Sequence, residues 1–247
     1  MSPYHPEKIN RVIIKLSGEF LAGEKGFGFD EELIDRITND IIEVKRLGYS
    51  VGIVLGGGNI FRGGTWSNAK MSRVTLDNIG MMATIQNALY LAEVLKIKNY
   101  STEVLSAVKA EKIAKFYTPT RAIQSMKEGK IVFLCGGTGN PFFTTDTAVV
   151  LRAAELEADL VLKGTKVGGV YTKDPAKHSD AEFIPEITFE EAIQRQLNVM
   201  DMTAFALAKE NNIPVKVFDL SIPGNLARAI ADVKVGTFVG NDLSNSN

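Results

Sequence analysis

Three short apolar segments of this chain run directly into loops that contain glycine. The segments have the length of β-strands and are apolar on both alternating faces, which is typical of strands buried on both sides of a sheet. Predicted helices separate them, so we expect an α/β fold with a mainly parallel sheet that helices cover on both faces. The segments are Arg11–Leu16, Ser50–Leu55 and Lys130–Cys135, and their loops are KLSGE (Lys15–Glu19), GGGN (Gly56–Asn59) and GGTGNPFFTTD (Gly136–Asp146).

Hydrophobic periodicity predicts the other elements. Asp30 is expected to cap a helix that runs to about Leu47, and Val167–Tyr171 is expected to form a hairpin. The sequence contains no linker, so we expect one domain over residues 1–247 with an ordered core from about residue 10 to residue 240. The remaining predicted helices are Val74–Leu95, Thr120–Lys127, Thr145–Glu157, Phe189–Gln194, Met202–Glu210 and one after Pro223–Gly224, and the remaining strands are Thr102–Ala107, Asp159–Lys163, Val215–Phe218 and Gly236–Val239.

Charge and residue usage exclude several classes of function. The net charge is −1, whereas a dedicated nucleic-acid-binding protein usually carries a basic surplus. Cys135 is the only cysteine, so no intrachain disulfide and no cysteine-based metal site can form. The two histidines, His5 and His178, lie in an N-terminal segment and in a polar loop, where we expect no catalytic or zinc site. No apolar run approaches the length of a membrane span and no signal peptide is visible, so we expect a cytoplasmic protein.

All three glycine loops are expected at the carboxyl edge of the sheet, where open parallel sheets bind ligands. Consecutive backbone N–H groups in such loops form an anion-binding nest, and the third loop also enters a helix N-terminus, which favours phosphate. One glycine loop is most often only a turn, but three at one edge favour a phosphate site. The chain has no GxxxxGK[ST] and no GxGxxG after a strand, which disfavours a P-loop NTPase and a Rossmann dehydrogenase.

Two lysines interrupt apolar runs near the ends of predicted strands. Lys15 lies in VIIKL and Lys163 lies in LVLKG. Either lysine alone could extend its ammonium group to solvent, but together they suggest a pair that grips a transferred phosphoryl group. Asp146 falls in the first turn of the following helix, where it either stabilises the helix start or holds the two lysines by charge pairing. Asp201 could act in the same way or cap the helix that begins at Met202.

The carboxylates of this chain do not cluster densely enough for a metal site made of protein ligands alone. We therefore predict no metal-ligating residues and expect Mg²⁺ to be bound through nucleotide phosphates and water. A phosphate acceptor needs no general base, because its oxygen is already ionised near neutral pH.

Six segments occur in an order that closely resembles the bacterial uridylate kinases of the amino acid kinase superfamily. GTGNPFFTTD is highly specific for this resemblance, whereas KLSGE alone would indicate only the superfamily. The resemblance covers about Val12–Val239 and implies three αβα layers, a homohexamer, and transfer of the γ-phosphoryl group of ATP to UMP to give ADP and UDP. The segments are KLSGE, GGGNIFRG, DNIGMMAT, GGTGNPFFTTDTA, LKGTKVGGVYTKDP and VMDMTAFALA.

The resemblance also implies which residues hold each nucleotide. Arg62 suits a phosphate because its guanidinium can bond two oxygens at once, although a solvated loop arginine is the alternative. Lys15, Lys163, Asp146 and Asp201 form the implied catalytic set, and the implied ATP-binding residues are Lys15, Leu16, Ser17, Gly18, Gly58, Arg62, Thr165, Tyr171 and Asp174.

The implied acceptor side contains one residue of the long helix and a continuous loop. Asp77 would bind UMP through its sugar, and on the residues alone a plain helix-start role is equally compatible. Tyr171 on the donor side would, taken alone, more often be a packed strand residue. The implied UMP-binding residues are Gly57, Asp77, Thr138, Gly139, Asn140, Pro141, Phe142, Phe143, Thr144 and Thr145.

The resemblance further implies GTP as an activator, bound between subunits by basic residues of the long helix and its neighbours, and UTP as an inhibitor. Here that region reads Leu91–Lys96 followed by Glu103, with fewer arginines than a strong GTP site requires. Gly169 stands where many relatives have Asp, so we expect a different hairpin turn. The loop linked to activation corresponds to Gly23, Glu24, Lys25, Gly26, Phe27 and Gly28.

Two other functions are compatible with the same loops. One is another small-molecule kinase of the superfamily that acts on an amino acid or a carbamate, although GTGNPFFTTD is hard to explain without a nucleoside monophosphate. The other is a non-catalytic nucleotide- or oxyanion-binding protein on the same fold. The presence of both Lys15 and Lys163 argues against this second alternative.

Overall fold

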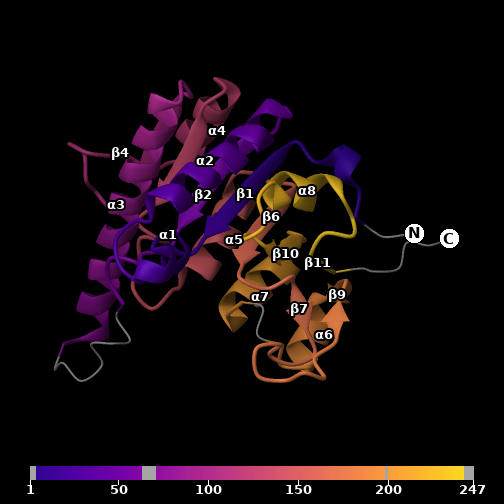
Figure 1. Cartoon of the computed structure of the whole chain (residues 1–247). Coiled ribbons are helices and arrows are strands. Elements are labelled where there is room, and N and C mark those ends of the chain that lie inside the picture. Colours follow the sequence, from indigo (N-terminus) through magenta and orange to yellow (C-terminus); the bar gives the residue numbers. More distant parts are fainter. Residues whose placement is uncertain (1–3, 63–70, 198–199, 242–247) are drawn as a thin grey trace.

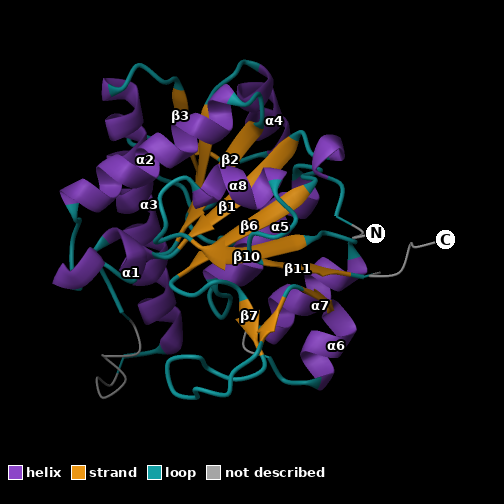
Figure 2. Ribbon diagram, turned by 45° about the vertical axis from the view of Figure 1, so that its right-hand side comes forward, coloured by secondary structure: helices purple, strands orange, loops and turns teal. Residues whose placement is uncertain are grey.

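A nine-stranded β-sheet runs through the centre of the molecule, and helices lie on both of its faces (Figures 1 and 2). The computed structural model describes residues 4–62, 71–197 and 200–241. The ends of the predicted domain, residues 1–3 and 242–247, lie outside the described residues, as do residues 63–70 and 198–199. Within the described part, no helix is both long enough and apolar enough to cross a membrane.

The order of the strands is β4-β3-β5-β2-β1-β6-β10-β11-β9. Neighbours in this sheet pair in parallel, except that β10 and β11 are antiparallel. The expected mainly parallel sheet is therefore confirmed. The strands are β1 (Arg11–Leu16), β2 (Ser50–Leu55), β3 (Thr102–Ser106), β4 (Lys115–Phe116), β5 (Ile131–Cys135), β6 (Leu160–Thr165), β9 (Glu186–Thr188), β10 (Val215–Asp219) and β11 (Thr237–Gly240).

Two separate apolar cores pack against the two faces of the sheet and make three layers. Buried residues of α2, α3 and α8 fill the first core, and those of α4, α5, α6 and α7 fill the second. A one-turn helix, α1, follows β1 directly. The helices are α1 (Gly18–Leu21), α2 (Glu31–Arg46), α3 (Arg73–Ile97), α4 (Pro119–Lys127), α5 (Thr145–Glu155), α6 (Phe189–Gln194), α7 (Met202–Glu210) and α8 (Asn225–Ala231).

Strand β1 divides its side chains between the two cores. Val12, Ile14 and Leu16 belong to the first core, whereas Ile13 belongs to the second. Because successive side chains of a strand point to opposite faces, Lys15 lies on the same face as Ile13, the face that α5 covers. The alternation that buries β1 therefore also directs the lysine toward α5.

Side-chain caps fix where the helices begin. Asp30 accepts a hydrogen bond from the N–H of Leu33 at 3.1 Å, as its predicted capping role requires. Thr144 caps α5, and Asp201 caps α7. Caps of this kind typically stabilise a helix by about 1 kcal/mol. The cap at Thr144 sets the position of Asp146 two residues later.

Most predicted elements occur within two residues of their expected bounds. The prediction of a hairpin within Val167–Tyr171 is wrong. That segment supplies only β7 (Val170–Tyr171), whose antiparallel partner is β8 (Phe183–Ile184), beyond a long loop. A segment this short cannot hold two strands and their turn. Gly169 instead allows its backbone to lie close to Thr237, because a Cβ on it would lie 2.5 Å from Thr237 Oγ1.

A buried lysine lies on β10, paired in register with Leu162 of β6. The side chain of Lys216 is fully buried. Its Nζ donates to the carbonyl oxygen of Val233 at 3.0 Å and lies 4.6 Å from the centroid of the Tyr4 ring. Burial lowers the pKa of Lys216 to about 8, and the charges of Glu186 and Asp232 offset only part of this shift.

Lys216 makes the stability of the fold depend on pH. Because its folded-state pKa is lower than its unfolded value, the burial penalty is fully present below about pH 8 and is relieved as pH rises toward 10.5. We expect the free energy of unfolding of the wild type to rise by about 2 kcal/mol relative to Lys216→Met between pH 7.5 and pH 10. Urea denaturation at both pH values measures this difference. A constant difference between the two proteins would contradict it.

Candidate active site

Asp146 bridges the two predicted lysines. Lys15 Nζ lies 3.1 Å from Asp146 Oδ1, and Lys163 Nζ lies 2.5 Å from Asp146 Oδ2. The three side chains are only 11–15% exposed. The charge-pairing role predicted for Asp146 is thus present in the structure, in addition to its place in the first turn of α5.

The sheet brings the lysines together because Lys15 and Lys163 are directly paired in the register of β1 and β6. These two strands also lie where the connections change sides. The connection from β1 to β2 passes through α2 on one face, whereas the connection from β6 to β10 passes through α7 on the other. Such a switch point is where open α/β sheets bind ligands.

The electrostatics of this triad favour an anion. Burial alone would raise the pKa of Asp146, but the ammonium groups of Lys15 and Lys163 outweigh it and hold that pKa below its ordinary value. Burial lowers the pKa of Lys163, and the attraction of Asp146 compensates only in part. With one carboxylate and two ammonium groups, the triad carries one positive charge beyond neutrality, which an incoming phosphate can use.

The loops after β1 and β2 touch each other, and glycine permits the contact. A Cβ on Gly18 would lie 2.5 Å from the backbone nitrogen of Gly58 and 2.8 Å from the carbonyl oxygen of Gly56. A Cβ on Gly56 would lie 2.9 Å from the backbone nitrogen of Gly18. Contacts this short exclude any side chain at these positions. Ser17 caps α1 by accepting a hydrogen bond from the N–H of Phe20.

A cavity of about 350 Å³ lies between the start of α3 and the loop before α5. Most residues predicted for the acceptor line it, namely Gly57, Asp77, Thr138, Asn140, Phe143, Thr144 and Thr145. Gly58, from the predicted donor set, also lines it, whereas Gly139, Pro141 and Phe142 belong to the same loop but do not. The further lining residues, which were not predicted, are Phe61, Arg73, Leu76, Gly80, Met81, Thr84 and Gly137.

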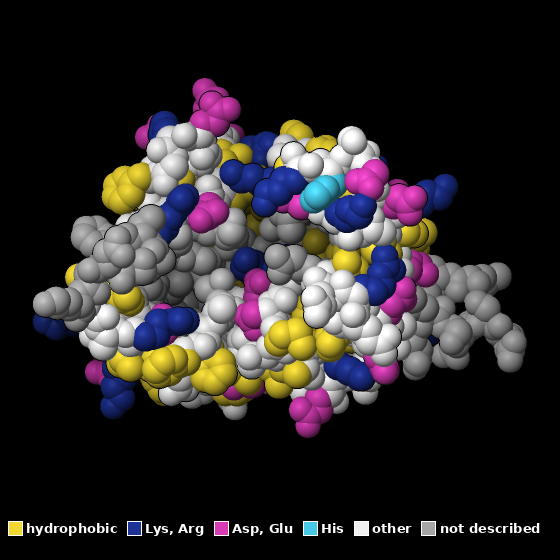
Figure 3. Space-filling view, turned by 90° about the horizontal axis from the view of Figure 1, so that it is seen from below, with side chains coloured by type: hydrophobic (Ala, Val, Ile, Leu, Met, Phe, Trp, Pro, Cys, Tyr) yellow, Lys and Arg dark blue, Asp and Glu magenta, His cyan; other side chains and the backbone are white. Residues whose placement is uncertain are grey.

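A second cavity, of about 540 Å³, lies beside β6 and β7. It brings together Thr165, Tyr171 and Asp174, which were predicted for adenosine, with Lys163 of the triad. The Tyr171 ring meets Phe183 edge to face at 5.5 Å, so it is also a packed residue. Figure 3 shows a hollow in the lower face of the molecule, with basic and acidic side chains around it.

The remaining residues of the predicted donor set lie around the first two loops. Leu16 is fully buried in the first core, so only its backbone can meet a ligand. Arg62 Nε donates to the carbonyl oxygen of Gly58 at 3.0 Å and lies 3.5 Å from the carboxylate of Glu19. Arg62 is thus held beside Gly58.

The loop Gly23–Gly28 lies against the same region. It begins with a 3₁₀ turn at Gly23–Lys25, and Phe27 is 68% exposed. The N–H of Gly28 donates to the carbonyl oxygen of Asn59 at 2.9 Å. The loop is therefore joined to the segment that follows Gly58.

Asp201 takes the capping role, one of the two roles left open for it. It caps α7 by accepting from the N–H of Ala204 at 2.8 Å. It also accepts from the hydroxyl of Thr144 and from that of Thr147, the latter at 3.1 Å. Asp201 thereby ties the loop before α5 to α7, and its charge acts to raise the pKa of Lys163 against the larger effect of burial.

Asp77 is not a helix-start residue. Helix α3 begins at Arg73 after its cap Ser72, so Asp77 lies in the second turn. Its Oδ2 accepts a hydrogen bond from the backbone N–H of Phe142 at 2.7 Å. This contact joins α3 to the predicted acceptor loop.

Comparisons with known proteins show the family of this chain. The sequence matches the amino acid kinase family over residues 10–219. It is 47% identical over 234 residues to a uridylate kinase of Bacteroides thetaiotaomicron, covering 95% of this chain and 99% of that protein. It is 45% identical to a uridylate kinase of Phocaeicola vulgatus over the same shares of both chains. The chain belongs to the amino acid kinase family, among the uridylate kinases.

Solved structures of the family have the same fold. The crystal structure of UMP kinase from Bacillus anthracis superposes with a TM-score of 0.92 at 37% identity, covering 95% of this chain and 97% of that one. UMP kinase from Ureaplasma parvum superposes with a TM-score of 0.90 at the same identity, covering 95% and 100%. The resemblance drawn from the six sequence segments and the three-layer α/β fold are both confirmed.

The structure adds residues around the candidate site that the sequence did not indicate. Asn87 on α3 is fully buried and donates to the carbonyl oxygen of Gly56 at 2.7 Å, while also pairing with Asn59. Arg152 on α5 is buried and donates to the carbonyl oxygen of Gly137 at 3.1 Å. A polar residue on an apolar helix face was the only available signal for either one.

Removing one ammonium group from the triad should slow phosphoryl transfer. We expect Lys15→Ala to lower kcat by at least about 10²-fold, the scale on which one electrostatic stabiliser of a transition state acts. Steady-state kinetics of ADP release measure this. Lys127→Ala, at an exposed position in the last turn of α4, is the matched control and should behave as wild type. A near-normal kcat for Lys15→Ala would refute the role.

Proposed function

We propose that this chain transfers the γ-phosphoryl group of ATP to UMP, giving ADP and UDP. The observation that carries the proposal is the Lys15–Asp146–Lys163 triad. Lys163 lines the larger cavity, and Thr145, the chain neighbour of Asp146, lines the smaller one. The names of the similar proteins, uridylate kinase and UMP kinase, support UMP as the acceptor.

The triad supplies electrostatic stabilisation rather than covalent chemistry. In phosphoryl transfer the developing charge spreads over the oxygens of the transferred group, and positioned cations stabilise it. Lys15 and Lys163 offer two such cations from rigid strands, and Asp146 holds them together against their repulsion. No side chain needs to act as a base, because the acceptor phosphate is already ionised near neutral pH.

We assign the donor to the larger cavity and the acceptor to the smaller one. On this assignment Lys15, Ser17, Gly18, Gly58 and Arg62 meet the phosphates of ATP. The cavity beside β6 and β7 has room for adenosine, with Thr165, Tyr171 and Asp174 in its walls. The acceptor lies against Gly57 and Asp77 on one side and the loop Thr138–Thr145 on the other, and the cavity between them supports this placement.

The carboxylates near the triad do not fit a direct metal ligand role. Asp146 is engaged by two lysines, and Asp201 by two hydroxyl groups and a backbone N–H. Among the described residues, no group of three or more His, Cys, Asp or Glu side chains could hold a metal ion. We therefore propose that Mg²⁺ enters with ATP, bound by phosphate oxygens and water.

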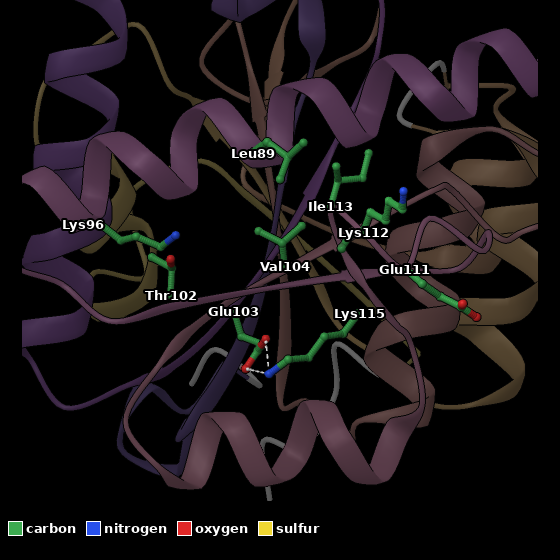
Figure 4. A pocket seen from close by; sticks show the side chains of 10 residues that line it. Leu89, Lys96, Thr102, Glu103, Val104, Glu111, Lys112, Ile113 and Lys115 are labelled. Atoms are coloured by element: carbon green, nitrogen blue, oxygen red, sulfur yellow. Dashed lines mark hydrogen bonds and ion pairs between the residues drawn. The ribbon is translucent and has the colours of Figure 1, made fainter.

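We propose that GTP activates this enzyme only weakly. A cavity of about 260 Å³ beside β3 contains Lys96, Lys112 and Lys115 (Figure 4). Glu103 lies in its wall, with its carboxylate 3.0 Å from Lys115 Nζ and 3.5 Å from Lys130 Nζ. This carboxylate neutralises basic groups that would otherwise attract a triphosphate.

UTP shares the uridine of UMP, so we propose that it inhibits by competing for the acceptor cavity.

Self-association as a homohexamer is the further proposal that the family suggests. Helix α3 is apolar around much of its circumference, and it leaves Met82 and Ile97 60% and 74% exposed. Exposed apolar residues on one helix are suited to a subunit contact.

Sedimentation equilibrium should give a mass about six times that of the chain, and a monomer at micromolar concentration would contradict the proposal.

A coupled assay of ADP release tests the proposed reaction against its alternatives. We expect turnover with ATP and UMP and at least about tenfold less with CMP, glutamate or aspartate, since a site built for one acceptor leaves its polar groups unpaired with another. Turnover with glutamate or aspartate but not UMP would favour another kinase of the superfamily. Nucleotide binding without any turnover would favour a binding protein.

Added GTP should change the rate of UMP turnover by less than about twofold, because Glu103 offsets the nearby lysines.

A further inference from the structure

Arg73, in the first turn of α3, holds the carboxylate of Asp77. Its Nε donates to Asp77 Oδ1 at 2.8 Å and to Oδ2 at 2.9 Å. Both residues line the smaller cavity. The spacing of four residues along a helix allows the contact, and a charged donor on a carboxylate makes it stronger than a hydrogen bond between neutral groups.

Asp77 also contacts the loop before α5. Its Oδ2 also accepts from the backbone N–H of Phe142 at 2.7 Å. Phe142 has a φ of +73°, a left-handed conformation that non-glycine residues rarely adopt. The guanidinium of Arg73 lies 6.0 Å from the centroid of the Phe142 ring, which is 64% exposed. Polar contacts, rather than burial in a core, therefore accompany this strained backbone.

The start of α3 has little apolar packing to fix it. Residues 71–75 are all exposed, and the first turns of α3 extend past the other helices of that layer (Figure 1). Arg73, Asp77 and Phe142 thus form a latch between the two walls of the smaller cavity, α3 on one side and the loop on the other.

We propose that Arg73 is a positioning residue that orients Asp77 toward the sugar of the acceptor and so sets the preference for a ribonucleotide over a deoxyribonucleotide. This inference rests on the proposed function. Among the described residues, Oδ2 of Asp77 accepts from two donors, whereas Oδ1 accepts from Arg73 alone and keeps a lone pair for a sugar hydroxyl. An acceptor that lacks the hydroxyl leaves this oxygen without a partner, which is how sites reject such analogues.

The experiment compares Arg73→Gln, Arg73→Lys and Asp77→Asn with wild type, using UMP and dUMP as acceptors. We expect Arg73→Gln to raise the KM for UMP about tenfold and to lower the ratio of kcat/KM for UMP over dUMP by a similar factor, since the substitution removes a charge-assisted hydrogen bond. The KM for ATP and kcat should stay within about threefold, because the latch does not reach the triad. Arg73→Lys should recover part of the UMP preference, and Asp77→Asn should reproduce the Arg73→Gln pattern.

Arg46→Gln is the matched control, because Arg46 ends α2 and donates to the hydroxyl of Tyr100 away from both cavities. An unchanged ratio of UMP to dUMP in Arg73→Gln would overturn the inference, as would an equal rise in the KM values for ATP and UMP. A wild type without turnover of UMP would instead refute the proposed function itself. The two failures are therefore distinguishable.

Discussion

One carboxylate placed between two ammonium groups is the interaction on which this site depends. Lys15 and Lys163 occupy paired positions on neighbouring strands, where like charges repel each other. Asp146 offsets that repulsion by contacting both. The arrangement needs the register of β1 with β6, the alternation of side chains along both strands, and a helix that begins over that face. A shift of one residue in the register would turn a lysine to the opposite face of the sheet.

The glycines of the loops permit close packing of the backbone as well as the proposed ligand binding. Gly18 and Gly56 approach so closely that neither tolerates a Cβ, and this approach brings the end of β1 against the end of β2. The buried pair Asn59 and Asn87 then holds the second loop to α3 through paired hydrogen bonds. The same backbone that could cradle phosphate is therefore fixed by contacts among protein groups before any nucleotide enters. Such preorganisation lowers the free energy that binding must spend on ordering the site.

Local patterns in the sequence predicted most of the fold, but they could not predict which distant residues meet. Apolar runs with glycine after them located the central strands, and Lys15 and Lys163 were visible because each interrupts such a run. Their direct pairing depends on strand order, which no local pattern contains. The strand at Phe183–Ile184 was missed because two residues show no periodicity. Arg73 and Asp77 have helical spacing, yet the contact of Asp77 with the N–H of Phe142 spans 65 residues. The identity of the acceptor came from resemblance, not from physical pattern.

On the proposed assignment, the groups that stabilise charge are separate from the groups that recognise the acceptor. The lysines stand on strands whose neighbouring residues are fully buried, so their positions are fixed by the core itself. The walls of the smaller cavity are instead an exposed helix start and a loop, joined by hydrogen bonds among Arg73, Asp77 and Phe142. Core packing opens only with global unfolding, whereas a few exposed hydrogen bonds can break and re-form locally. The core therefore holds the lysines in place, whereas the wall of the proposed acceptor cavity is held by contacts of the kind that can open locally.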